Sequence, residues 1–162
     1  MNTLTMAAAG IITAAFILYT IGIFAERAAG TLKPRHLIFF WLGLACDAGG
    51  TLLMTSIAQT TGITAGAHAV TGTLALGLML FHALWATLVL VRGSQQARKS
   101  FHKLSLGVWL FWLVPYLCGL LMGIPALHLT APAATTYAVA ASLGVGAVLG
   151  TRSRARRRAN RS

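Results

Sequence analysis

Two histidines, His68 and His82, enclose the stretch HAVTGTLALGLMLFH, which is apolar and has no charged residue. Fourteen residues make about 3.9 turns of an α-helix, so the two side chains would lie about 40° apart around the axis and ~21 Å apart along it. Imidazole is both a metal ligand and a proton carrier. The pattern therefore allows three interpretations: ligands of two stacked haems, a proton relay, or two unrelated side chains held by structural hydrogen bonds.

Asp47 is the second residue that could do chemistry. The chain has only two acids, and Asp47 is eleven residues into an apolar run that begins at Leu37. A charge at the centre of a membrane helix costs at least ~2.5 kcal/mol. Asp47 is therefore protonated, paired, or facing an interior lined by water or protein. The small residues of CDAGGT would let another helix or a cofactor approach. The alternative is a neutral Asp47 that joins two helices by a structural hydrogen bond.

His82 and Asp47 are predicted to lie at the same depth. His82 is ten residues before Arg92, and the runs that carry the two residues are consecutive and antiparallel. We expect the two side chains to face each other, with the carboxyl group orienting the imidazole as it does behind metal-bound histidines. The other acid, Glu26, ends the first apolar run beside Arg27 and is predicted to be an interfacial charge.

The remaining histidines divide between the two ends of the apolar runs. His36 and His102 begin the second and fourth runs within the basic stretches KPRH and FHK. Each is either an interfacial side chain or the partner of His82 in a ligand pair or relay. His68 and His128 lie at the opposite ends of their runs, and His128 is the weaker candidate.

The composition predicts the elements that carry these residues. Of 162 residues, 57% are hydrophobic and only 9% are charged, against about 25% in soluble domains. A bilayer-spanning helix needs roughly 20 mostly apolar residues. Five runs qualify, the last being weaker because it is rich in Ala, Gly and Thr: 6–25, 37–56, 66–91, 104–124 and 131–150. We expect a single all-α domain, a bundle of five transmembrane helices with the first four as its core.

The basic residues predict how the chain is threaded. All 13 Lys and Arg residues fall in alternate connections and in the basic tail 151–162. With five spans they lie on one side, which the positive-inside rule makes cytoplasmic, so the N-terminus is outside and the C-terminus inside. Because the tail directly follows a span, it is expected to bind anionic lipid headgroups rather than nucleic acid.

The helix from His68 to His82 resembles the ligand helix of membrane b-type cytochromes, which carries this His-x13-His spacing. Gly72 and Gly77 lie between the histidines, where a flat macrocycle could approach the backbone. The resemblance implies haem b held by pairs of histidines and electron transfer across the membrane. On that basis the ligands are His82 with His102, or with His36, and His68 belongs to a second site.

Three blocks resemble the HsmA-like family of small bacterial membrane proteins: KPRHLIFFWLGLACDAGGTLLM, TGTLALGLMLFHALWATLVLV and FHKLSLGVWLFWLVPYLCG. The resemblance spans most of residues 10–124. It implies a multi-pass protein of the bacterial cytoplasmic membrane, and it carries no activity with it.

Three functions stay open at this point. The preferred one is a membrane electron-transfer protein whose haem is held by His82 and His102, with Asp47 tuning the site. The second is a proton- or cation-coupled carrier or channel that uses Asp47 and His82, where a homo-oligomer would supply further helices. The third is an interaction subunit without chemistry. An enzyme is less expected, because nucleophile-elbow, Walker and HExxH motifs are absent from the sequence.

Overall fold

The computed structural model describes residues 3–61 and 67–159, with the side chains of 61, 67–69, 125 and 154–159 excepted. Its helices are α1 (Thr3–Ala29), α2 (Pro34–Thr61), α3 (Ala67–Arg92), α4 (Gln95–Gly123), the short 3-10 helix η1 (Pro125–Leu127) and α5 (Ala131–Ala159). All five α-helices are long and apolar enough to cross a membrane, the fifth with a mean hydropathy of 1.5. The predicted all-α bundle of five such helices is confirmed.

Helices α1, α2, α4 and α5 are longer than the apolar runs that predict them. α4 begins at Gln95 rather than near Leu104, because the Ser94 side chain accepts a hydrogen bond from the Ala97 amide at 3.2 Å and caps the helix. α5 continues through part of the basic tail to Ala159, since Arg and Ala are strong helix formers. At the other end of α1, Gly30 has a φ of 65°, the left-handed conformation that commonly ends a helix.

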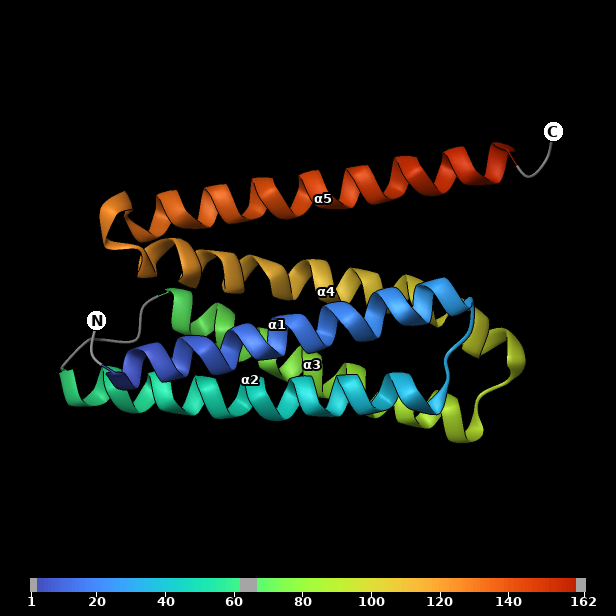
Figure 1. Ribbon diagram of the computed structural model, residues 1–162, viewed down its shortest axis with the longest axis horizontal. Coiled ribbons are helices and arrows are strands. Elements are labelled where there is room, and N and C mark those ends of the chain that lie inside the picture. The colour runs from blue at the N-terminus through green and yellow to red at the C-terminus, as the bar shows by residue number, and fades with distance from the viewer. Residues whose placement is uncertain (1–2, 62–66, 160–162) are drawn as a thin grey trace.

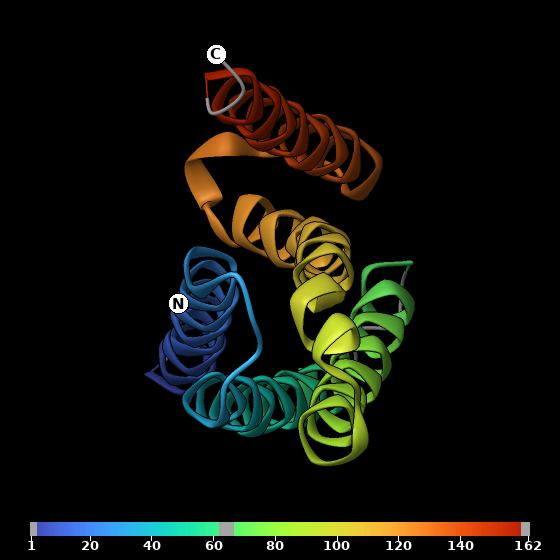
Figure 2. The same ribbon diagram turned by 90° about the vertical axis from the view of Figure 1, so that its right-hand side faces the viewer.

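Helices α1 to α4 form the core of the bundle. α1 packs on α2, α2 on α3, α3 on α4 and α4 back on α1, so these four close a ring. The end-on view shows this ring, with α5 lying outside it against α4 (Figure 2). The side view shows that the five helices lie roughly parallel to one long axis and that consecutive helices run in opposite directions (Figure 1).

Missing side chains bring α1 and α2 close together. A Cβ atom on Gly43 would lie 2.6 Å from the Tyr19 ring, and one on Gly50 would lie 2.4 Å from the Ile12 side chain. A Cβ on Gly22 would lie 2.8 Å from the Phe40 ring. Small residues are a usual means of close packing between membrane helices, where van der Waals contact drives association. This seam positions Tyr19 and Phe40 in the bundle interior.

α5 is held more loosely than the other helices. Only 17% of its apolar window is buried, against 39% for α4. Ala134 and Ala138 pack against α4, and the Ser142 hydroxyl donates to the Leu110 carbonyl at 2.6 Å. The weak fifth run is thus a helix that packs against α4, on the outside of the four-helix core.

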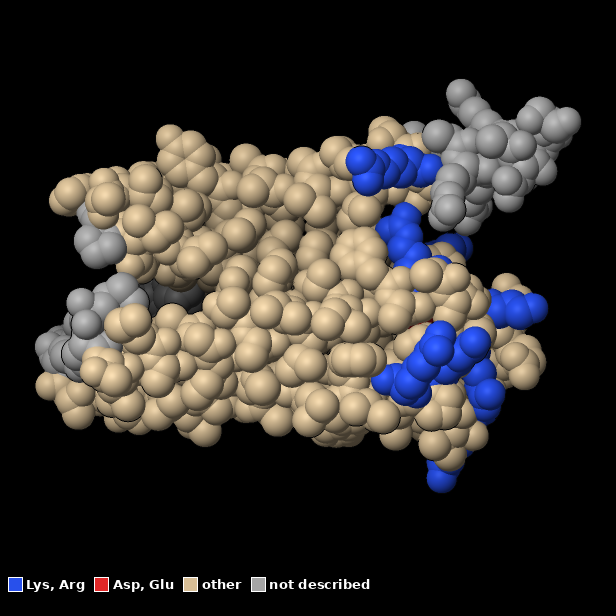
Figure 3. All heavy atoms as spheres, viewed as in Figure 1, with Lys and Arg blue, Asp and Glu red and all other residues tan. Residues whose placement is uncertain are grey.

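The basic side chains gather at one end of the molecule (Figure 3). This end, here called the basic end, holds the α1–α2 and α3–α4 turns and the last turns of α5. A large part of the remaining surface is apolar, with Leu52, Val91 and Leu143 about 70% exposed. Such a surface fits contact with lipid along the length of the helices.

Candidate functional site

A buried polar centre lies between α1, α3 and α4 and joins His82, Ser105 and Glu26. His82 and Ser105 are both fully buried, and His82 Nε2 lies 3.0 Å from the Ser105 hydroxyl oxygen. The His82 ring is enclosed by Phe40, 4.6 Å away between centroids, and by Phe101, 5.3 Å away. The imidazole is therefore held in place by two aromatic rings and one hydroxyl group.

Glu26 completes this centre from α1. It is fully buried, and its carboxyl group lies next to the Ser105 hydroxyl. Neither carboxyl oxygen has a partner in hydrogen-bond geometry, and neither does Nδ1 of His82. Three polar atoms in this small space thus lack a hydrogen bond, although buried polar groups are paired in the great majority of cases.

The sequence-based assignment of Glu26 to the membrane interface is wrong. The neighbouring Arg27 does not hold Glu26 at the surface, because its guanidinium group reaches α5 and donates to the Leu149 carbonyl at 3.2 Å and to the Ser153 hydroxyl. Tyr19, Ile23 and Glu26 lie on the buried stripe of α1: Ile23 is four residues after Tyr19, and Glu26 is three residues after Ile23. Helical periodicity therefore turns its side chain inward, one turn before the helix ends.

Asp47 lies in a second polar centre, between α2 and α4. Its Oδ2 accepts a hydrogen bond from the Trp112 indole N–H at 2.8 Å, and Asp47 and Trp112 are 5% and 3% exposed. The Tyr19 ring meets Trp112 edge-on, with the centroids 5.2 Å apart. Tyr19 is fully buried, and its hydroxyl group lacks a hydrogen-bond partner. Asp47 thus anchors an indole that belongs to the aromatic packing between α1 and α4.

The structure does not bring Asp47 and His82 together. Each has a different hydrogen-bond partner, Trp112 for Asp47 and Ser105 for His82. The expected pairing rests on similar depth along antiparallel helices. Depth alone does not determine the direction in which each side chain points from its helix axis. In the structure the two residues are divided between the two polar centres.

His36 and His102 are both placed at the basic end, and neither is hydrogen-bonded to His82. The His36 ring is fully buried, and its Nδ1 accepts from the Lys33 amide at 3.1 Å. It thereby satisfies an amide at the start of α2. His102 is half-buried, and its Nδ1 contacts the Lys99 carbonyl at 2.8 Å. Both histidines thus have local partners, His36 at the start of α2 and His102 within α4.

Two further candidates lie toward the opposite end. His128 is exposed, with Nδ1 3.3 Å from the Ala126 carbonyl. His68 belongs to α3, but its side chain lies outside the described residues. The expectation that His68 and His82 share one face of the helix therefore stays a prediction.

The packing around His82 does not fit a haem. The ring nitrogen that would face iron is 3.0 Å from Ser105, and Phe40 and Phe101 occupy the sides of the imidazole. The expected second ligand, His102, is bonded in its own helix. Among the described residues, no group of three or more His, Cys, Asp or Glu is placed to hold a metal ion. A macrocycle at His82 would have to displace both aromatic rings.

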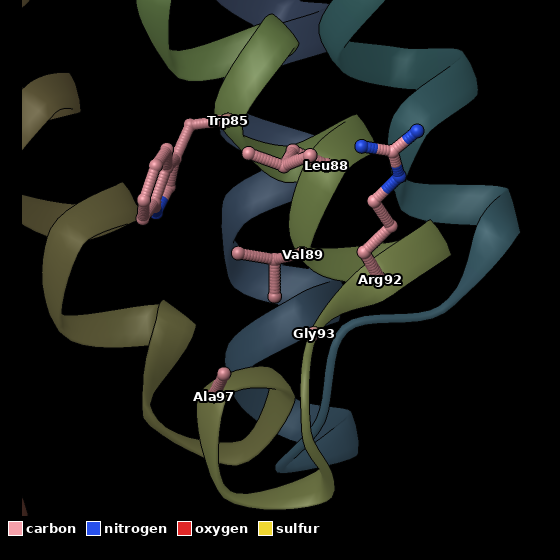
Figure 4. Close-up of a pocket in the computed structure, with 6 residues that line it drawn as sticks. All are labelled: Trp85, Leu88, Val89, Arg92, Gly93 and Ala97. Carbon is pink, nitrogen blue, oxygen red and sulfur yellow. The ribbon is translucent and has the colours of Figure 1, made fainter.

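A shallow hollow of about 290 Å³ lies on the α3–α4 hairpin at the basic end. Figure 4 shows the residues that line it, four from α3, one from the α3–α4 turn and one from the start of α4: Trp85, Leu88, Val89, Arg92, Gly93 and Ala97. Trp and Arg are typical of the membrane interface, where ring and cation meet the headgroups. The hollow does not include any residue of the two polar centres.

Sequence reasoning missed two residues of the first centre, Glu26 and Ser105. Glu26 had a usable signal, because counting helical turns from Tyr19 places it on the same face of α1. Ser105 had none, since a serine in an apolar helix most often bonds its own backbone. Only the crossing of α3 and α4 brings its hydroxyl to His82.

Comparisons of the chain with known protein families, with curated proteins and with solved structures found no match. The resemblance to the HsmA-like family stays a prediction.

Proposed function

We propose that the protein moves protons across the membrane, with Glu26 and His82 as the groups that take up and release them. The observation that carries this proposal is the buried centre itself. Glu26 and His82 lie in two different membrane helices, fully buried, with three polar atoms that have no partner. Ionisable residues inside membrane helices are rare and mark proton and ion pathways.

Charge balance favours a mobile cation at this centre. Neither Arg27 nor Arg98 is hydrogen-bonded to Glu26: Arg27 donates to the Leu149 carbonyl at 3.2 Å and Arg98 to the Leu90 carbonyl at 2.6 Å. An ionised Glu26 would thus face His82 and Ser105 without a cation hydrogen-bonded to it. A proton on the carboxyl group, or on the imidazole, removes this imbalance at low cost.

Tyr19 extends the line of polar groups toward the membrane centre. Tyr19 lies two turns from Glu26 on the same face of α1, or ~10 Å along the axis. Its buried hydroxyl group is the next unpartnered polar atom in that direction. Gaps of this length are crossed by hydrogen-bonded water. By the positive-inside rule the centre lies nearer the cytoplasm, because the basic end is close to it.

The test uses purified protein in lipid vesicles that enclose a pH-sensitive dye. A potassium gradient with valinomycin drives protons inward, and the rate of acidification is measured. We expect the rate to exceed that of protein-free vesicles, and Glu26→Gln to remove the excess while Ser142→Ala, a buried serine outside the centre, keeps it. Wild-type vesicles that acidify no faster than protein-free ones would overturn the proposal.

An absorption spectrum separates this function from electron transfer. The protein is expressed with a supply of haem, purified, and measured before and after reduction with dithionite. We expect no Soret band from a centre packed as this one is. A Soret band with sharp reduced bands that His82→Ala abolishes would show that His82 binds haem and would contradict the assignment above.

A further inference from the structure

We infer that the Ser105 hydroxyl group carries the proton between Glu26 and His82. This inference rests on the proposed function and assigns a role to a residue that is not itself ionisable under physiological conditions. Ser105 is fully buried, 3.0 Å from Nε2 of His82 and next to the Glu26 carboxyl group. It is thus the hydroxyl group that lies between the two ionisable side chains, bonded to His82 of α3 and beside Glu26 of α1.

The chemistry needs one hydroxyl group between an acid and a base. A serine hydroxyl donates one hydrogen bond and accepts two. With Glu26 protonated, its O–H donates to Ser105, whose own O–H donates to Nε2 of His82. In the transfer the Glu26 O–H bond breaks as the proton joins the Ser105 oxygen, and the Ser105 proton moves to Nε2. The products are a carboxylate, an intact serine and an imidazolium ion, so atoms and charge balance.

Ser105 is free for this role because it does not bond its own helix. Other hydroxyl groups in these helices donate to the carbonyl four residues earlier, as Thr13, Thr87 and Thr135 do at 2.8 Å each. Ser105 instead contacts His82 on the neighbouring helix. Its donor and acceptor capacity is therefore available to both partners across the bundle.

The His82 ring is also free to change which nitrogen carries its proton. A ring tautomer is usually set by the hydrogen bond that the other nitrogen makes. Nδ1 of His82 is buried and has no partner, so neither tautomer is locked. After the transfer both ring nitrogens carry a proton, and the proton on Nδ1 leaves to a water molecule that reaches this nitrogen as the acceptor.

Infrared difference spectroscopy across the pH range tests whether Ser105 bonds Glu26. The carbonyl band of the protonated Glu26 side chain is the one that Glu26→Gln removes. We expect Ser105→Ala to shift this band to higher frequency, because the protonated carboxyl group can then no longer donate to the Ser105 oxygen as the relay requires, and Ser105→Thr to restore it. Ser142→Ala should leave the band unchanged. A Glu26 band that is the same in Ser105→Ala and in the wild type would overturn the inference.

Proton flux into vesicles gives the second readout. We expect Ser105→Ala to lower the flux by at least roughly tenfold, since proton transfer through a positioned side chain contributes about 10²–10⁴-fold in rate. Ser105→Thr should regain a large part of it. A Ser105→Ala variant that conducts like the wild type would overturn the relay and leave the proposed function standing. A wild type without flux would overturn both, whatever the infrared band shows.

Discussion

The two buried polar centres of this bundle differ in how completely their hydrogen bonds are made. In the Asp47–Trp112 centre, the carboxyl group meets an indole N–H at 2.8 Å, and the unpartnered group beside it is the uncharged Tyr19 hydroxyl. In the Glu26–Ser105–His82 centre, both carboxyl oxygens and one ring nitrogen have no partner. Both centres lie in apolar helices, so the difference cannot be ascribed to exposure to water.

This difference separates a structural role from a functional one. A satisfied hydrogen bond between membrane helices stabilises the packing by about 0.6 kcal/mol on average. Unsatisfied buried groups cost about 1–3 kcal/mol each, so they oppose folding. A centre that destabilises the protein is more readily explained by an activity that needs it. Under the proposed function, Asp47, the stronger candidate in the sequence, is the structural carboxyl group, and Glu26 is the functional one.

Proton flux should separate the two carboxyl groups most strongly. We expect Glu26→Gln to lower the flux about 100-fold, within the range for a positioned proton donor. Asp47→Asn keeps an oxygen that accepts from Trp112 and should stay within about twofold of the wild type. Dye-loaded vesicles measure both variants side by side. The reverse order, with Asp47→Asn inactive and Glu26→Gln active, would exchange the roles of the two centres.

Removing the indole donor should have the next largest effect. Trp112→Phe leaves the Asp47 oxygen without its partner, so we expect the free energy of unfolding to fall by about 2 kcal/mol. Reversible unfolding of the protein from mixed micelles with increasing SDS measures this change. Trp85→Phe is the matched control, because Trp85 is 42% exposed and should change stability little. Equal losses in the two variants would show that the Asp47 bond contributes nothing.

Overpacking the α1–α2 seam should weaken the Asp47 centre indirectly. In Gly43→Ala the new methyl group would lie 2.6 Å from the Tyr19 ring, which packs edge-on against Trp112. We expect a loss of about 1.5 kcal/mol in the same unfolding assay. Gly49→Ala provides the control, since its Cβ would have no neighbour within 4 Å. If Gly43→Ala left the free energy of unfolding unchanged, the seam between α1 and α2 would be able to adjust to the added methyl group.

An apolar replacement at Glu26 should have the smallest effect and the opposite sign. Glu26→Leu removes two unpartnered oxygens from the interior, so we expect the free energy of unfolding to rise by about 1 kcal/mol. Asp47→Leu should lower it, because the Trp112 N–H is then left unpaired. Unfolding of the two variants under identical conditions measures both signs. A loss of stability in Glu26→Leu would mean that the carboxyl group has a stabilising partner in the membrane.

Hydropathy and charge predict a large part of the fold because they act locally. Each apolar run predicts one helix without reference to its neighbours, and the Ala- and Gly-rich run that becomes α5 is helical as expected. The start of α4 at Gln95 differs from the prediction because the basic residues before Leu104 are good helix formers behind a serine cap.

The candidate site was harder to predict, because side-chain partners depend on how each helix is turned about its axis. The sequence singles out His82 as the one deep histidine and pairs it with Asp47, whereas its partner in the structure is Ser105. His36 lies buried against the Lys33 amide and is not hydrogen-bonded to His82. The depth of a residue along its helix axis follows from its position in the sequence. The neighbouring side chain that it meets depends on how the helices pack against one another.

The amino-acid sequence by itself determined that this chain is a bundle of apolar helices with its cations at one end. Those properties follow from residue types along single segments, which the bilayer constrains one segment at a time. Only the tertiary structure decided that Glu26 is buried, that Asp47 bonds Trp112 and that His82 meets Ser105. These pairings arise where α1, α2, α3 and α4 cross, and close packing at the glycine seam fixes which faces meet.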